Sequence, residues 1–246
     1  MILDLDLDFF LDDITYSRRL NRRLRRDRYH PWSEKQVRDF LEHRCGLSIN
    51  RKVKGRVVKD HHEAFFFWKE LIDKNLLEIP FEVVHIDGHA DLGSGDGTWK
   101  YIMGELLHLP VEERDKPNKG GYYGLHEGNY LAFALVCRWI NKLTFVLHSL
   151  WRYDLVVYYF KNYYVPSGIL QLKKYNKKQL NRKFKKNFTR ITPLALEPEV
   201  PFERVRYYNY KNNKSISFII LSHSPPYTPK TADALIPIIK EYINEI

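Results

Sequence analysis

Cysteine is scarce in this chain: Cys45 and Cys137 lie far apart and outside any Cys-x-x-Cys pattern. Neither a zinc ribbon nor a disulfide framework is therefore expected, and a reducing cytoplasm is the expected compartment. No apolar run approaches the length of a membrane span. The first residues alternate acidic and apolar side chains instead of forming a secretory signal, so we expect a protein without a membrane segment.

Residues 93–97, Gly-Ser-Gly-Asp-Gly, are rich in glycine but lack the lysine and the spacing of a phosphate-binding loop. Apolar residues, in contrast, are plentiful. With 246 residues, of which 44% are hydrophobic, the chain can bury a large core without disulfides or partners. No internal repeat is apparent, and we expect a single domain over residues 1–246.

Hydrophobic periodicity predicts strands that alternate with helices. Strands are expected at Ile2–Phe9, Glu82–Ile86, Leu143–Leu147 and Ser217–Leu221, with weaker ones near Val57 and Ile169. Helices are expected at Ser33–His43, Glu63–Lys74, Trp99–Leu107, Asn129–Ile140 and Thr231–Ile246. Residues 160–215, rich in Tyr, Lys and Asn, are expected to be less regular. This alternation favours an α/β fold, a three-layer sandwich in which helices cover both faces of a mainly parallel sheet.

The most informative segment follows the predicted strand at Val83–Ile86. Asp87, His89 and Asp91 occupy alternate positions just as the apolar run stops. Alternate side chains of an extended segment share one face, so two carboxylates and an imidazole should converge. Oxygen-rich ligation with some imidazole suits manganese, or alternatively zinc or iron. We interpret this segment as the floor of a metal site.

The first residues carry a second acidic cluster. Asp4, Asp6 and Asp8 alternate with apolar residues. Three aspartates on one face of a strand are unusual, because Asp is depleted in strands and like charges repel. A solvated edge strand is the alternative, although exposed edges more often carry Lys or mixed charges. We predict that Asp6 and Asp8, at the carboxyl end of the strand, join the metal site.

A third element is Lys59–Glu63, which contains adjacent histidines. It lies after a short apolar run and before a predicted helix, where open α/β sheets place ligands. His61 is the predicted metal ligand, and His62 is the alternative.

These residues together resemble a known group. His-Ile-Asp-Gly-His-Ala-Asp, residues 85–91, resembles the Asp-x-His-x-Asp motif of arginases and agmatinases, Asp60-His61 resembles their earlier Asp-His motif, and Asp6-Leu7-Asp8 resembles their Asp-x-Asp pair. Together with Glu-Gly-Asn-Tyr at 127–130, the motifs look more closely like an arginase-like family that includes peptide arginases, which convert arginine side chains of ribosomal precursor peptides to ornithine. The resemblance spans roughly residues 1–150 and the stretch Leu221–Thr228.

The resemblance implies an arginase/deacetylase-like fold with one change of order. In arginases the Asp-x-Asp strand follows the Asp-x-His-x-Asp strand, whereas here it lies at the N-terminus, and the Asp-Pro that usually follows the acidic pair is replaced by Phe9-Phe10. A parallel sheet tolerates this order, because ligands at strand ends meet in space whatever the connectivity.

The resemblance also implies a reaction centre with two Mn²⁺ ions, which would activate a shared water toward the guanidinium carbon of arginine. Asp91 would hold the proton of that water, and His126 would protonate the departing amine. The alternative for the segment around His126 is that Glu127 and Asn129 only cap the next helix. A carboxylate must also receive the guanidinium, and the candidates are Glu127, Glu63 and Asp96. Hydroxyls of the segment 221–228 would orient ligands or substrate.

The chain is basic, with a net charge of +10. Basic residues concentrate at 18–28 and again at 173–186. Such runs attract polyanions, yet no recognised nucleic-acid module is present, and most charge runs are solvated helix faces. We favour docking of an acidic leader segment of a precursor peptide over nucleic-acid binding. The oligomeric state is not predicted.

Two other functions remain open from the sequence. A metal-dependent amidohydrolase or deacetylase of acylated amines would keep the metal centre, although deacetylase-like relatives typically use one zinc and fewer carboxylates. A basic binding module with a structural metal site is the non-enzymatic alternative. The abundance of Asp favours two metals and the arginase-like hydrolase.

Overall fold

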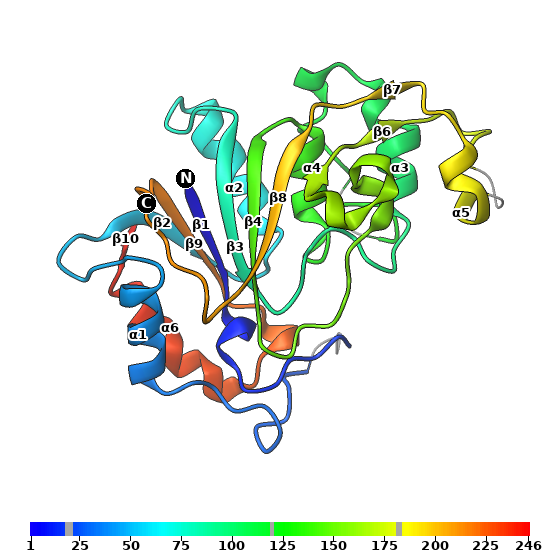
Figure 1. Cartoon of the computed structure of the whole chain (residues 1–246). Helices are drawn as coiled ribbons and strands as arrows, with labels where there is room; N and C mark the ends of the chain where they lie inside the picture. The colour runs from blue at the N-terminus through cyan, green and yellow to red at the C-terminus, as the bar shows by residue number, and fades with distance from the viewer. Residues whose placement is uncertain (18–21, 119–120, 181–183) are drawn as a thin grey trace.

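The computed structural model of the chain describes residues 1–17, 22–118, 121–180 and 184–246 (Figure 1). Its strands are β1 (Ile2–Asp6), β2 (Val53–Val58), β3 (Phe81–Asp87), β4 (Ile140–Leu147), β5 (Ile169–Leu170), β6 (Lys173–Lys174), β7 (Ala195–Leu196), β8 (Val200–Arg206), β9 (Phe218–Ser222) and β10 (Ile243–Glu245). Its α-helices are α1 (Glu34–His43), α2 (Glu63–Asp73), α3 (Thr98–Gly104), α4 (Tyr130–Val136), α5 (Phe184–Asn187) and α6 (Leu235–Lys240). Arg18 and Arg19 of the first basic run and Arg182 and Lys183 of the second lie outside the described residues.

Eight of the strands form one sheet in the order β10-β2-β9-β1-β3-β4-β8-β5. All neighbours pair in parallel except β5, which runs antiparallel to β8 at the edge. The predicted α/β class with a mainly parallel sheet is therefore confirmed. β6 and β7 form a separate antiparallel pair.

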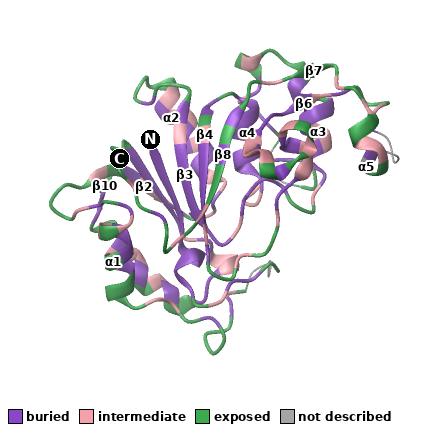
Figure 2. Ribbon diagram, viewed as in Figure 1, coloured by how far each residue is buried: buried purple, intermediate pink, exposed green. Residues whose placement is uncertain are grey.

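Helices cover both faces of the sheet. Because successive side chains of a strand point to opposite faces, neighbouring residues of one strand pack against different helices. In the β1–β3 pair, Ile2 lies opposite Val83 and Leu3 opposite Val84. The first pair belongs to the hydrophobic cluster beneath α2, α3 and α4, and the second to the cluster beneath α1 and α6. Figure 2 shows the central strands and α4 buried, while α1 and α2 carry both buried and exposed residues. Helices thus flank the sheet in the manner of a three-layer sandwich.

Helix boundaries follow local signals in two cases. Ser33, the first residue of the helix predicted at Ser33–His43, caps α1 in a capping box with Gln36. α2 begins at Glu63 and buries Phe65, Trp68 and Leu71 against the sheet. Within the described part of the chain, every helix is too short or too polar to cross a membrane.

Other predicted boundaries were wrong. The first strand stops at Asp6 instead of Phe9, because Asp6 accepts the backbone N–H of Asp8 (2.9 Å) and starts a 3₁₀ turn, Leu7–Phe10. The helix predicted at Asn129–Ile140 ends at Val136, since Arg138 adopts a left-handed backbone (φ 59°) and β4 begins at Ile140.

The predicted C-terminal helix at Thr231–Ile246 is likewise divided. A 3₁₀ segment, Lys230–Ala234, leads into α6, and Ile243–Glu245 forms β10 beside β2. The region 160–215, expected to be less regular, contains β8, which pairs with β4 near one edge of the sheet.

Candidate metal centre

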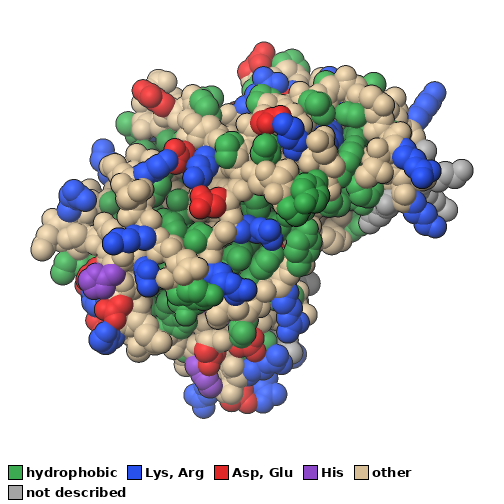
Figure 3. All heavy atoms as spheres, viewed as in Figure 1, with side chains coloured by type: hydrophobic (Ala, Val, Ile, Leu, Met, Phe, Trp, Pro, Cys, Tyr) green, Lys and Arg blue, Asp and Glu red, His purple; other side chains and the backbone are tan. Residues whose placement is uncertain are grey.

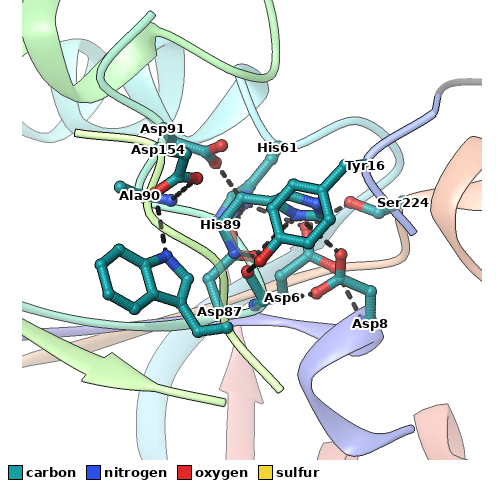
Figure 4. A network of polar contacts seen from close by, with 12 residues as sticks. Asp6, Asp8, Tyr16, His61, Asp87, His89, Ala90, Asp91, Asp154 and Ser224 are labelled. Carbon is teal, nitrogen blue, oxygen red and sulfur yellow. Dashed lines mark hydrogen bonds and ion pairs between the residues drawn. The ribbon is translucent and has the colours of Figure 1, made fainter. Parts of the chain in front are cut away.

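The acidic segments predicted from the sequence meet at the carboxyl ends of four adjacent strands. β2, β9, β1 and β3 are neighbours in the sheet, and the segments that leave them line a cleft of about 370 Å³. The structure brings together all six residues predicted as metal ligands, which line this cleft (Figure 4): Asp6, Asp8, His61, Asp87, His89 and Asp91. Convergence at strand ends is what a parallel sheet produces.

The route to this convergence differs from the one predicted. β3 ends at Asp87, so His89 and Asp91 lie in the following loop and not on an extended strand. Asp87 accepts the backbone N–H of His89 (2.8 Å), and Asp91 has a positive φ of 47°. A turn, not strand alternation, therefore directs His89 and Asp91 back over the end of the sheet.

One side of the cluster gathers around His61. Its Nδ1 atom lies 3.0 Å from Asp6 Oδ2, 3.0 Å from Asp87 Oδ2 and 3.2 Å from Asp91 Oδ2. One ring N–H cannot satisfy three carboxylates. Among the described residues, neither His61 Nδ1 nor Asp87 Oδ2 has a hydrogen-bond partner of acceptable geometry, although both atoms are buried. A cation between these groups would satisfy both atoms, because buried charges need partners or metals.

The other side of the cluster gathers around His89. Its Nδ1 atom lies 3.1 Å from Asp8 Oδ2 and 3.4 Å from Asp87 Oδ1. Asp87 thus gives one oxygen to each side of the cluster. Among the described residues, four overlapping groups of Asp and His side chains have ligand atoms close enough together to hold a metal ion, and three of these groups contain Asp87. Two of the three lie entirely in the lining of the cleft: Asp6 with His61 and Asp87, and Asp8 with Asp87 and His89. The buried Asp and His groups can therefore accommodate a metal.

A hydrogen bond at Nε2 fixes the ring orientation of each of the two histidines. His61 Nε2 lies 3.0 Å from Asp4 Oδ1, and His89 Nε2 lies 2.8 Å from the carbonyl oxygen of Thr15. When each Nε2–H donates to these acceptors, both rings present Nδ1 to the carboxylates. The hydroxyl of Ser224, in the segment after β9, donates to Asp6. Ser224 belongs to the segment 221–228, whose hydroxyls are predicted from the sequence to orient ligands or substrate.

Beneath the cluster, Asp4 connects three buried side chains. It receives hydrogen bonds from His61, from His85 Nδ1 (3.0 Å) and from the hydroxyl of Tyr130. Burial acts to raise the pKa of Asp4, but the interactions with His61 and His85 outweigh it, so that the pKa lies below its usual value. Asp4 therefore stays ionised and supports His61 from below.

We expect Asp4→Asn to weaken metal binding by about 10–100-fold, the range typical for a group that supports a metal ligand. The amide keeps the volume of Asp4 but not the charge that orients His61. Competition with a chromophoric chelator measures the affinity, and thermal unfolding of the metal-free variant separates this effect from misfolding. Unchanged affinity in a folded variant would contradict the support ascribed to Asp4.

Protons compete with metal in this cluster. Burial and the charges of Asp6 and Asp87 raise the pKa of Asp8 well above its usual range, and burial and Asp87 raise the pKa of Asp91 to about 7. Burial acts to lower the pKa of His89, but Asp8 and Asp87 raise it well above its usual value. The raised pKa values favour the protonated forms of these groups, so a metal that binds here must displace protons.

Metal affinity should consequently rise with pH between about 6 and 8, by about tenfold per pH unit for each proton displaced. The sign follows from the raised pKa values, because lower pH fills the ligands with protons. Calorimetric titration in two buffers of different ionisation enthalpy counts the protons released. An affinity that is flat across this range would show that the ligands are already deprotonated.

The other predicted site residues are distributed differently. His126 and Glu127 line the cleft, but both ring nitrogens of His126 are engaged, Nε2 with Asp96 (3.0 Å) and Nδ1 with the backbone N–H of Gly128 (3.1 Å). Asp96 lies outside the lining and also accepts from Thr98 and Asn129.

His61, and not His62, faces the carboxylates. The ring of His62 instead packs near Phe66, with centroids 6.3 Å apart. Glu63 accepts the backbone N–H of Lys59 (2.9 Å) at the start of α2 and does not line the cleft.

Several residues of the site were not predicted. Asp154, in the segment after β4, lines the cleft and accepts from the backbone of Ala90 and from Trp151, both at 2.9 Å. Burial raises the pKa of Asp154. Asp154 could have been predicted, because it is an acidic residue that follows β4, the strand next to β3. His85 was not predicted either, although it lies two residues before Asp87 and so shares its face of the strand.

The sequence matches no protein-family model, and a search of curated proteins finds no significant match.

Proposed function

We propose that this chain is a manganese-dependent hydrolase that converts arginine side chains of peptides to ornithine, with release of urea. The observation that carries the proposal is that two donor groups, both in the lining of the cleft, share Asp87. Four carboxylates and two imidazoles suit two oxygen-preferring divalent ions better than one zinc. The metal pair, when bound, supplies a hydroxide at neutral pH and polarises the electrophile.

The side chains around the cluster fit the needs of this reaction. Water adds to the guanidinium carbon, the bond from that carbon to the side-chain nitrogen breaks, and the departing amine takes a proton. Asp91 lines the cleft, with Oδ2 3.2 Å from His61 Nδ1, and is the proposed acceptor of the proton of the attacking water. His126 is the proposed proton donor to the amine, and it must first release Asp96.

The cleft also holds two carboxylates that are not among the six residues predicted as metal ligands. Glu127 and Asp154 both line it, whereas Asp96 and Glu63, the other carboxylates considered for substrate, do not. A guanidinium forms strong paired hydrogen bonds with carboxylates. We propose Glu127 and Asp154 as the groups that receive the guanidinium of the substrate.

A peptide substrate accords with the charge of the chain. Lys and Arg side chains, with some Asp and Glu among them, are scattered over the face shown in Figure 3. Together with the net charge of +10, they favour encounter with an acidic segment such as a peptide leader.

The test is to incubate the Mn²⁺-loaded protein with an arginine-containing peptide and to weigh the product. A loss equal to the mass of cyanamide for each arginine, with stoichiometric urea, is expected. Metal-stripped protein serves as the control and should leave the peptide unchanged. A second peptide containing acetyl-lysine tests the alternative, because loss of the acetyl group with intact arginine would favour a deacetylase.

A further inference from the structure

A second pocket, of about 300 Å³, adjoins the metal cleft. Three arginines line it, Arg25, Arg28 and Arg152, and none of the described residues in its lining is acidic. Tyr16 lines both this pocket and the cleft, and so forms the wall between them. We refer to it as the arginine pocket.

Tyr16 fixes how close the two sites lie. Its ring meets the ring of His89 edge-on, with centroids 5.0 Å apart, and the guanidinium carbon of Arg152 lies 5.7 Å from the same Tyr16 centroid. Figure 4 shows the Tyr16 ring beside His89 and, in this view, above Asp6 and Asp8. The backbone N–H of Arg152 donates to the Tyr16 hydroxyl (2.5 Å), which also contacts the carbonyl oxygen of Gly88 (3.4 Å). Arg152 is thus attached to the edge of the metal site.

The distance between Arg152 and the metal cleft matches the length of a substrate. The guanidinium carbon of Arg152 lies 5.7 Å from the Tyr16 centroid, which is 5.0 Å from the His89 centroid, so it cannot be farther from His89 than these two distances together. An extended chain advances about 3.3–3.6 Å per residue. An arginine side chain that enters the cleft therefore leaves its own carboxyl end, or the neighbouring residue, within range of the arginine pocket.

The two cavities have opposite charge. The cleft offers Glu127 and Asp154 beside the metal ligands, whereas the arginine pocket offers only cations among its charged lining residues. Existing ion pairs leave these cations available. Arg25 pairs with Asp27 and Arg28 with Asp13, but the two arginine side chains are 70% and 67% exposed, so the pairs are weak. No ion pair to Arg152 occurs among the described residues, and a guanidinium prefers a carboxylate partner.

We infer that the arginine pocket binds a carboxylate of the substrate, one position from the arginine whose guanidinium enters the metal cleft, with Arg152 as the principal contact. The inference rests on the proposed function and adds to it a substrate class. Two sources share this chemistry: the α-carboxylate of a C-terminal or free arginine, and the side chain of an adjacent Asp or Glu.

Three short peptides of the same length distinguish the sources: one with a neutral, amidated flank, one with Asp after the arginine, and one that ends in arginine with a free carboxylate. Urea release gives kcat/KM for each. One charge-assisted hydrogen bond corresponds to a preference of about tenfold or more over the neutral peptide. Preference for the free carboxylate alone assigns the pocket to the α-carboxylate, and preference for the Asp peptide assigns it to an acidic neighbour.

Variants decide whether the arginine pocket causes the preference. In Arg152→Gln the ratio between charged and neutral peptides should fall to about one, and Arg28→Gln should reduce it in part. Arg51→Gln is the matched control, because Arg51 is exposed two residues before β2, at the opposite end of that strand from the cleft. Equal rates on all three peptides in the unmodified protein, or a preference that survives Arg152→Gln, would overturn the inference.

A binding measurement separates this inference from the reaction itself. Fluorescence anisotropy of labelled neutral and Asp-containing peptides should show tighter, salt-sensitive binding of the acidic one, lost in Arg152→Gln. If the acidic peptide binds more tightly in this way but no urea is released, the arginine pocket is supported and the proposed reaction is rejected. Equal binding of both peptides would reject the pocket even if urea is formed.

Discussion

Asp87→Ala is expected to remove bound metal and to reduce urea release to background. Asp87 directs one oxygen toward His61 and the other toward His89, so its loss disrupts both halves of the cluster at once. We expect metal affinity to fall more than about a hundredfold, beyond the range typical of a merely supporting residue. Elemental analysis after gel filtration measures the metal content, and the urea assay measures turnover.

Two further variants show whether the loss of metal is specific to the Asp87 carboxylate. Asp87→Asn keeps the volume and one carbonyl ligand but loses the charge, and should retain part of the metal. Asp115→Ala removes a carboxylate that pairs with Lys69 outside the cleft, and should retain metal and turnover. Full metal content in folded Asp87→Ala would refute the assignment of Asp87 as a ligand shared by two ions.

The residues of the metal centre could be predicted because the sequence places strong signals at strand ends. Buried parallel strands appear as continuous apolar runs, and the charged residues that interrupt β1 and β3 are anomalous there. Ligands in such sheets gather at the carboxyl ends of strands. This rule alone predicts that Asp6 and Asp87 lie close together, even when the order of the strands is unknown.

The support of the centre was harder to predict. Asp4 has the same alternation as Asp6, yet it lies fully buried below the cluster and bonds to His61 and His85. Alternation shows that two side chains share a face but not how deep each one lies. Tyr130 joins this network from α4, a contact across 126 residues that no local pattern encodes.

The edges of the sheet also lacked a sequence signal. β8 contains Pro201 and three charged residues, and its side chains alternate between buried and exposed over only its first few positions. β8 is a strand because it pairs with β4, and not because its residues favour the strand conformation. β10 is three residues long, and its strand character depends on hydrogen bonds to β2.

Gly55→Val is expected to destabilise the fold by about 3 kcal/mol or more. A Cβ atom at Gly55 would lie 2.2 Å from the carbonyl oxygen of Ile219 in β9 and 3.1 Å from the side chain of Ile243 in β10. Both neighbouring strands must then move away from β2, and β2 carries the segment that holds His61 between Asp4 and Asp6.

The reporters are the urea concentration at half-unfolding and the metal affinity of the fraction that remains folded. Lys54→Val is the matched control, because Lys54 is the exposed neighbour of Gly55 on the same strand and valine suits a strand position. Its unfolding midpoint should stay close to that of the unmodified protein. Since metal binds only the folded state, added Mn²⁺ should raise the midpoint of Gly55→Val. Equal stability of the two variants would show that β2 and β9 can separate without cost, and that the position of His61 does not depend on their close contact.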